Sequence, residues 1–284
     1  MPGLISQRVI AILLGRLRMS VDKAILTYLH LSKQMYSGIK LWRERPFNAA
    51  AKAKRAVSAI VMETSSSDRM LDTHDDADRC RVLICAISAD DPSHPTRLRS
   101  YKRLDQVAND FTIWEAVRAT SAFHLETLPS GSMMKPNLGC NNPIVQLLDE
   151  AFECYEGDRG VACILSLGAG HATGLLPRTG FFPNLRYNKT APLLKALAAD
   201  CERTHSALYK RFDRGGVSKV YFRFNLDTGM SGVGADEWNM PGAIVSYIEA
   251  YFSSIECDRK IDLLVKNIVA RQGSVSIKQA GALA

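Results

Sequence analysis

Apolar side chains recur every three or four residues in several stretches of the chain, which is the spacing of amphipathic helices. Residues 20–36 show this spacing, and Ser20 with Asp22 supplies an N-cap and an acidic first turn. Thr112 and Glu115 have the spacing of a capping box ahead of another helix. Spacing, caps and helix propensity together predict helices over residues 20–36, 48–59, 113–121, 143–155, 190–208, 241–252 and 258–269.

The helix expected from residue 143 can be predicted in more detail. Pro143 occupies the favoured first helical position, with Asn142 before it as the cap. Asp149 and Glu150 are expected to face away from the apolar stripe, which consists of Ile144, Leu147, Leu148, Ala151, Phe152 and Tyr155.

Two near-continuous apolar runs of strand length, residues 81–88 and 161–167, are typical of strands buried on both faces of a parallel sheet. Residues 220–225 alternate between apolar and polar side chains, which predicts a strand with one wetter face. Helices and strands therefore alternate, and the predicted fold class is α/β. Residues 271–284 are expected to be a frayed tail.

The composition agrees with a globular protein. The chain has 284 residues, of which 46% are hydrophobic, so it can bury a sizeable core. Its longest apolar run, Val9 to Leu14, is far shorter than the roughly 20 residues that cross a bilayer, so neither a membrane span nor a secretory signal is expected. Seven cysteines without a CxxC pair indicate reduced thiols in a cytoplasmic protein.

Basic residues are concentrated at the amino terminus. The net charge is +7, yet residues 1–55 hold 11 Lys or Arg against 2 acids, a balance of +9 that leaves about −2 for the rest. The simpler interpretation is the solvated face of a helical region. The alternative is a surface that meets anionic lipid or nucleic acid.

Common catalytic and cofactor motifs are missing from the sequence. There is no Gly-x-Ser-x-Gly pentapeptide, so Ser132 and Ser231 are interpreted as turn residues. The Gly168-Ala169-Gly170 string follows a predicted strand but lacks the full GxGxxG, which favours a structural turn over a nucleotide site. The six histidines include no HExxH pattern, and we expect no metal and no other cofactor.

Several ordered strings resemble the patatin-like phospholipase family, particularly its fungal members. The likeness spans roughly residues 9–270 and is carried by Val82–Ser88, Leu98–Tyr101, Ile113–Ala122, Leu138–Pro143, Leu165–Gly170 and Phe222–Asn225. The resemblance implies a three-layer α/β/α domain with a mainly parallel sheet. Its domain would span residues 1–175, with residues 176–284 as a carboxy-terminal α/β extension. The family hydrolyses acyl esters of lipids with a Ser-Asp dyad and without a metal.

The chain departs from this family where the chemistry resides. Alignment of the strings places Ile5 at the serine position and Lys135 at the aspartate position, and the oxyanion loop would lie before residue 1. No catalytic residue is therefore assigned. The first strand and the nucleophile strand would be missing as well, so residues 82–88 and 161–167 are expected to lack pairing partners. A fragment or an incomplete gene model and a functional pseudoenzyme both fit these departures.

The leading hypothesis is thus a member of the patatin-like lipid acyl hydrolase family, with a role in lipid metabolism. With the given sequence it is expected to be catalytically inactive. The alternative is a non-catalytic lipid-surface or protein-interaction module that uses the basic amino-terminal helices. A nucleotide-binding α/β domain using Gly168 to Gly170 is a third hypothesis. The expected partner is a lipid or membrane surface met peripherally by the amino-terminal region, and not nucleic acid.

Overall fold

The structure is a computed structural model whose chain forms two compact units, Met1–Leu138 with Ala235–Asn239, and Gly139–Gly234 with Met240–Ala284. The sequence-predicted boundary at residues 175 and 176 lies outside the described residues. The fold is mixed α/β and mostly helical. The structure describes residues 7–36, 46–65, 67–72, 80–88, 91, 94–103, 111–121, 126–127, 133–135, 142–168, 190–226, 241–271, 273 and 275–282.

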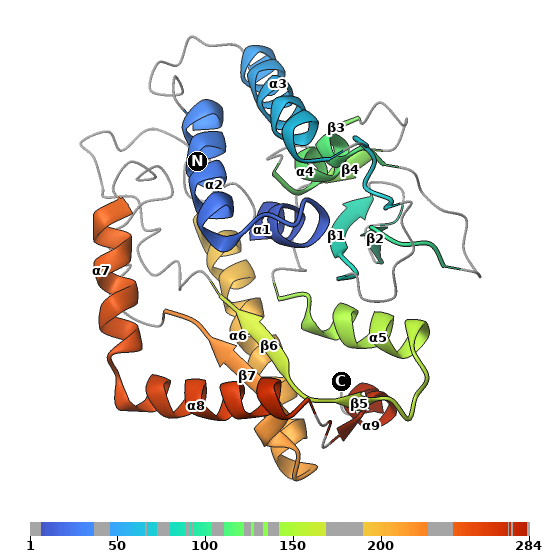
Figure 1. Ribbon diagram of the computed structural model, residues 1–284, viewed down its shortest axis with the longest axis vertical. Helices are drawn as coiled ribbons and strands as arrows, with labels where there is room; N and C mark the ends of the chain where they lie inside the picture. Colours follow the sequence, from blue (N-terminus) through green and yellow to red (C-terminus); the bar gives the residue numbers. More distant parts are fainter. Residues whose placement is uncertain are drawn as a thin grey trace. The chain divides into compact units, whose positions relative to one another are not determined.

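The first unit combines helices with one small antiparallel sheet (Figure 1). The strand order is β2-β1-β4-β3, and every described pairing in this sheet is antiparallel. Its described elements are α1 (Gln7–Ala11), a π-helical segment (Ile12–Arg16), α2 (Val21–Tyr36), α3 (Pro46–Thr64), β1 (Leu83–Ser88), β2 (Pro95–Arg99), α4 (Ile113–Ser121), β3 (Glu126–Thr127) and β4 (Met133–Lys135).

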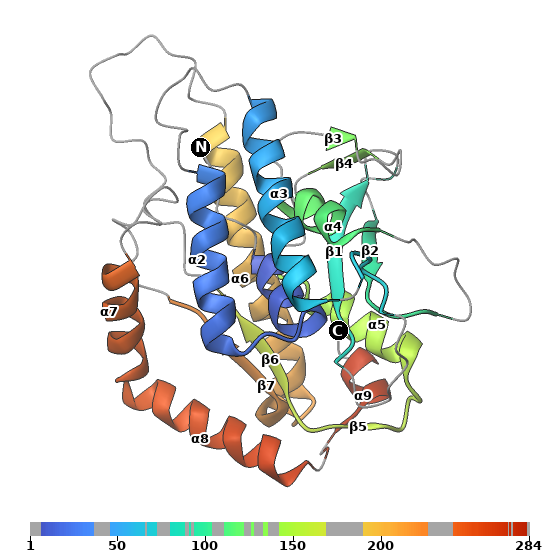
Figure 2. The same ribbon diagram turned by 45° about the horizontal axis from the view of Figure 1, so that its top comes forward.

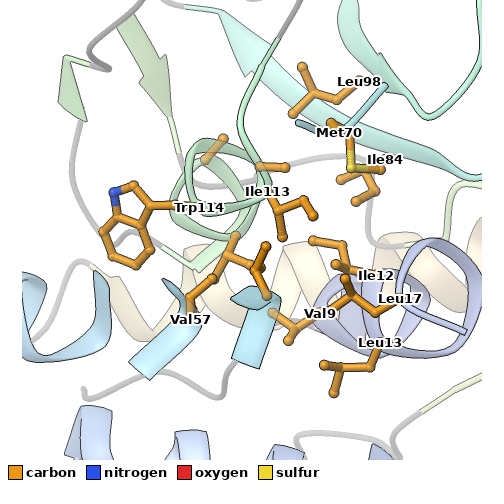
Figure 3. Packing of buried hydrophobic residues seen from close by; sticks show 14 of the residues in the cluster. Val9, Ile12, Leu13, Leu17, Val57, Met70, Ile84, Leu98, Ile113 and Trp114 are labelled. Atoms are coloured by element: carbon orange, nitrogen blue, oxygen red, sulfur yellow. The ribbon is translucent and has the colours of Figure 1, made fainter. Parts of the chain in front are cut away.

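The core of this unit joins the amino-terminal helices to the sheet. Figure 3 shows Val9, Ile12 and Leu13 in one cluster with Ile113 of α4 and Ile84 of β1. Each of these side chains is at most 2% exposed. Burial of large aliphatic side chains contributes about 1.5–3 kcal/mol each, so this cluster is a main source of the unit's stability.

The prediction for the first apolar run was wrong in two respects. Residues 83–88 form a buried strand, but β1 pairs antiparallel with β2 on one side and with β4 on the other. It is neither part of a parallel sheet nor without partners. A continuous apolar run favours a buried strand, but it carries no information about strand direction.

The second unit contains a parallel strand pair between helices (Figure 2). Strands β6 and β7 lie side by side, and both α6 and α8 contact β7. A second pair, β5 with β8, is antiparallel. The described elements are α5 (Ile144–Cys154), β5 (Gly160–Val161), β6 (Ile164–Leu167), α6 (Thr190–Arg214), a 3₁₀ turn (Ser218–Val220), β7 (Tyr221–Phe224), α7 (Pro241–Phe252), α8 (Ile255–Ala270), β8 (Val275–Ser276) and α9 (Ile277–Ala282).

The pair β6–β7 corrects two further expectations. Of the strand predicted at residues 161–167, Ile164–Leu167 forms β6, which has β7 as a parallel partner, whereas Val161 belongs to β5. Strand β6 is not buried on both faces, since Leu165 and Leu167 are 41% and 65% exposed. In the part of the chain that the structure describes, β6–β7 is the one parallel pairing, and no extended parallel sheet is seen there.

Most predicted helices are confirmed, and the local capping signals explain why. The Ser20 hydroxyl accepts from the Lys23 amide at 3.3 Å where α2 begins. Thr112 and Glu115 form the predicted capping box, with the Glu115 carboxylate accepting from the Thr112 amide at 2.8 Å. Helices α6 and α3 are longer than predicted, which is common for helix ends.

Three details of the second unit differ from prediction. Asn142 does not cap α5, because Pro143 is the N-cap residue and makes no side-chain cap bond. Glu150 is 3% exposed instead of solvent-facing, and it accepts from the Cys154 thiol. The expected tail at residues 271–284 instead forms β8 and α9 in its described part, because β5 supplies a pairing partner from far along the chain.

Candidate functional site

The candidate site is a buried polar cluster beside the parallel pair β6–β7. Ser166 of β6 and Arg223 of β7 are register partners, and Arg223 Nη1 donates to the Ser166 hydroxyl at 2.9 Å. Ser166 is 7% exposed. A serine hydroxyl and a guanidinium therefore meet inside the protein, where a polar group is stable only if it is hydrogen-bonded.

Helix α6 supplies the counter-charge for Arg223. Glu202 Oε1 lies 2.8 Å from Arg223 Nη2, and the same oxygen accepts from Asn225 Nδ2 at 3.1 Å. The Arg223 side chain is 9% exposed and that of Glu202 is 26% exposed. Within the described part of the chain, Arg223 Nε is buried and has no hydrogen-bond partner. The ion pair thus compensates most, but not all, of the cost of burying the guanidinium.

Asn142 joins the start of α5 to this cluster. Its Oδ1 lies 3.5 Å from the Ser166 hydroxyl, and its Nδ2 donates to the Cys201 carbonyl of α6 at 3.3 Å. Asn142 was expected to cap α5. Its side chain instead links the start of α5 to β6 and α6. This accounts for its burial, with 9% of its surface exposed.

Tyr221 and His205 extend the cluster toward the apolar core. His205 Nδ1 lies 3.0 Å from the Tyr221 hydroxyl, and the two rings are in tilted contact at 5.6 Å between centroids. Burial raises the pKa of Tyr221, while Arg223 and hydrogen bonds from Ser166 and Asn142 oppose this shift. The phenol therefore stays neutral over the range in which most proteins are folded.

Gly168 allows the chain to pass close to the cluster. Its amide donates to the Phe224 carbonyl at 2.8 Å, which extends the β6–β7 ladder by one bond. A Cβ at this position would collide with the Asn225 side chain and lie 2.8 Å from Arg223 Nη2. Only glycine leaves room for both polar side chains here. Ala169 and Gly170, which complete the string, lie outside the described residues.

The chemistry of this arrangement is structural. A nucleophilic serine needs a neighbouring base that removes its proton. The Ser166 hydroxyl lies instead beside a guanidinium, which is always protonated, and an amide oxygen. The cluster fixes the positions of α5, α6 and the ends of β6 and β7, and it does not form a nucleophile–base pair.

The residues assigned to the dyad positions lie elsewhere in the chain. Lys135 is the last residue of β4, where its backbone pairs with Ile87 of β1. Ile5 lies outside the described residues, as do Ser132 and Ser231. The structure therefore does not test the dyad positions as a pair.

The amino-terminal basic residues do not share one role. Arg16 is 6% exposed and donates to the Met70 and Arg69 carbonyls at 2.9 and 2.8 Å. Arg18 forms an ion pair with Asp72. These two arginines hold residues 67–72 against the amino-terminal helices. Arg16 and Arg18 therefore do not belong to the solvated charged face that was the simpler interpretation of the sequence.

Other candidate ligands are dispersed. Among the described residues, no three His, Cys, Asp or Glu side chains are grouped closely enough to hold a metal ion. His30 is exposed on α2 beside Gln34, and His94 is exposed beside Asp91. None of the described helices is long and apolar enough to cross a bilayer.

The sequence analysis singled out only some residues of the polar cluster. Asn142, Ser166, Arg223 and Asn225 belong to strings quoted for the family resemblance, but their contact was not predicted. No local signal identified Glu202, which lies in the middle of a long helix. Comparison with protein-family models, with curated proteins and with solved structures yields no match to this chain.

Proposed function

We propose that this chain is a patatin-like phospholipase family member that does not itself hydrolyse acyl esters. The supporting observation is the meeting of three strings on which the resemblance depends. Asn142 from Leu138–Pro143 and Ser166 from Leu165–Gly170 approach each other across 24 positions of sequence. Arg223 from Phe222–Asn225 binds the same serine across 57 positions.

This meeting supports the proposal because local sequence cannot produce it. Each string is short and far from the others, so an accidental likeness gives no reason for their polar side chains to bond to one another. A buried polar network of this kind helps to specify one arrangement of the elements that it joins. A three-layer α/β/α domain with a mainly parallel sheet belongs to the proposal, and the parallel pair β6–β7 is the described element that agrees with it.

The lack of activity is proposed from the residues at the dyad positions. The family reaction needs a carboxylate that activates a serine hydroxyl. Lys135 carries a cation at the position of the carboxylate, and Ile5 has no hydroxyl. Loss of both members of such a dyad leaves little catalysis. The proposal includes a cytoplasmic location, peripheral to membranes.

A direct assay tests the lack of activity. Purified chain is incubated with a phosphatidylcholine substrate and, separately, with a fluorophosphonate probe that labels activated serines. We expect neither fatty-acid release nor labelling above a boiled sample, with an active serine lipase as the positive control. Heat-sensitive release or labelling would overturn the proposed inactivity.

A second measurement tests the family assignment. In an experimental structure, β6 and β7 should be neighbours within a longer parallel sheet that has helices on both faces. An isolated two-stranded pair would contradict the assignment. Sequencing the transcript across codons 128–140 checks the residue at the aspartate position, where an Asp codon before Leu138 would replace Lys135 and reopen the question of activity.

A further inference from the structure

Helix α2 exposes large apolar side chains in its first two turns. Val21, Ile25 and Leu26 are 63%, 53% and 69% exposed, while Ala24 and Leu31 on the opposite side are buried in the core. Leu26 lies on the outward side together with Lys23 and Lys33. Aliphatic side chains next to lysines are a combination found in helices that lie at a membrane surface.

Helix α3, which packs against α2, adds more positive charge. Lys52, Lys54 and Arg55 are exposed, and Met62, nearer the end of this helix, is 84% exposed. On the two helices together, exposed cations exceed exposed carboxylates by five to two. The cations are Lys23, Lys33, Lys52, Lys54 and Arg55, and the carboxylates are Asp22 and Glu63.

Helix α8 shows that this excess is not a general feature of exposed helices. It also exposes apolar side chains, with Ile255 and Val269 at 73% and 75%. The charges on α8 balance, however, because it carries three basic and three acidic residues. The basic residues are Arg259, Lys260 and Lys266, and the acidic residues are Glu256, Asp258 and Asp262. Compared with α8, the α2–α3 face combines exposed aliphatic side chains with a net positive charge.

We infer that the outer face of α2 and α3 binds anionic phospholipid surfaces, with the lysines and Arg55 near the headgroups and Leu26 inserted among them. The positive excess complements phosphatidylserine-type headgroups, and each cation near such a surface strengthens binding about fivefold. Leu26 adds the apolar contact that electrostatics alone lacks. The exposed apolar groups are aliphatic, whereas single-stranded nucleic acid is typically bound on aromatic side chains. This inference depends on the first unit and stands apart from the proposed loss of hydrolysis.

The experiment is co-sedimentation of the full chain with vesicles. Vesicles of phosphatidylcholine with phosphatidylserine should bind it, vesicles of phosphatidylcholine alone should bind it far less, and added salt should weaken the binding. The paired change Lys54→Gln with Arg55→Gln should reduce the affinity about 25-fold, at about fivefold for each cation. Leu26→Ser should reduce it about tenfold and leave the salt dependence in place.

Matched variants on α8 provide the control. Arg259→Gln with Lys266→Gln removes two exposed cations, and Val269→Ser removes an exposed apolar side chain, so both should leave vesicle binding unchanged. Circular dichroism shows that each variant is folded. Equal binding to both vesicle types, or equal losses from the α3 and α8 pairs, would overturn the inference. So would binding to RNA or to an acidic protein without binding to vesicles. Fatty-acid release is measured separately, so failure of one proposal does not affect the other.

Discussion

Arg223 and Ser166 are register partners in the parallel pair β6–β7, and their side chains bond at 2.9 Å on the side of the pair that faces α6. The guanidinium is thereby held between β6 and Glu202 of α6. One buried arginine thus connects two strands and a helix that are distant in sequence. The stability of the second unit should depend on it.

Replacement of Arg223 by Met should lower the free energy of unfolding by about 2–3 kcal/mol. The change leaves Glu202 without its ion-pair partner, and breaking a buried pair by removing one side typically costs about 3–5 kcal/mol. The lower figure is expected because Glu202 is 26% exposed. Urea denaturation followed by circular dichroism measures the effect.

The control for this variant is Arg203→Met, which removes an exposed arginine from α6, the helix that carries Glu202. It should change the free energy of unfolding by no more than about 0.5 kcal/mol. The double variant Arg223→Met with Glu202→Gln should recover part of the loss, since no unpaired carboxylate remains. Equal effects of Arg223→Met and Arg203→Met would show that the ion pair contributes nothing.

Gly168→Ala should destabilise the second unit by about 1–3 kcal/mol, the usual cost of overpacking. The added methyl group collides with Asn225 and crowds Arg223, so both polar side chains must move. Gly242→Ala is the matched control, because the space around that glycine is open. Thermal unfolding of the two variants should differ, and identical melting temperatures would contradict the close packing at Gly168.

Arg16→Met should destabilise the first unit by about 2–4 kcal/mol. The Met70 and Arg69 carbonyls lose their guanidinium donor, and an unsatisfied buried acceptor costs about 1–3 kcal/mol. Lys23→Gln, an exposed change in the following helix, should have little effect. Hydrogen exchange of the α1 and α2 amides provides a local measurement. Unchanged protection in Arg16→Met would show that residues 67–72 are held by other contacts.

Stability should fall at high pH because burial raises the pKa of Tyr221 above its ordinary value of 10.0. The raised pKa means that the folded state retains the proton more tightly than the unfolded state. The stabilisation that comes from protonated Tyr221 is fully present below the pKa of the unfolded state. It is lost as the pH rises through the pKa of the folded state. Tyr221→Phe should therefore flatten the decline in unfolding free energy above about pH 10.

Tyr209→Phe is the control for this pH dependence. Tyr209 is 47% exposed and also contacts the His205 ring, so the variant tests whether any tyrosine near this histidine would give the effect. Urea denaturation at a series of alkaline pH values compares the two. If the unfolding free energy of both variants falls with pH as steeply as that of the parent chain, Tyr221 is not the group responsible.

Local signals explain why so many helices were predictable. The Ser20 cap and the Thr112–Glu115 box act within one turn, so they are readable from neighbouring residues and are confirmed by the bonds they make. Burial of residues 83–88 was also predicted correctly from their continuous apolar run, whereas the same signal at residues 161–167 was wrong, because Leu165 and Leu167 are exposed. The dyad departures at Ile5 and Lys135 stay predictions from the resemblance.

What the sequence determined about this protein was the position of its helices, the burial of its first strand and the uneven distribution of its charge. Tertiary structure decided the direction of β1, the pairing of β5 with β8, and the role of Asn142 as a link and not a cap. It also divided the basic residues into buried Arg16 and the exposed cations of α2 and α3. The physical reason is range: caps and periodicity act over a few residues, whereas strand pairing and buried ion pairs depend on partners tens of residues away.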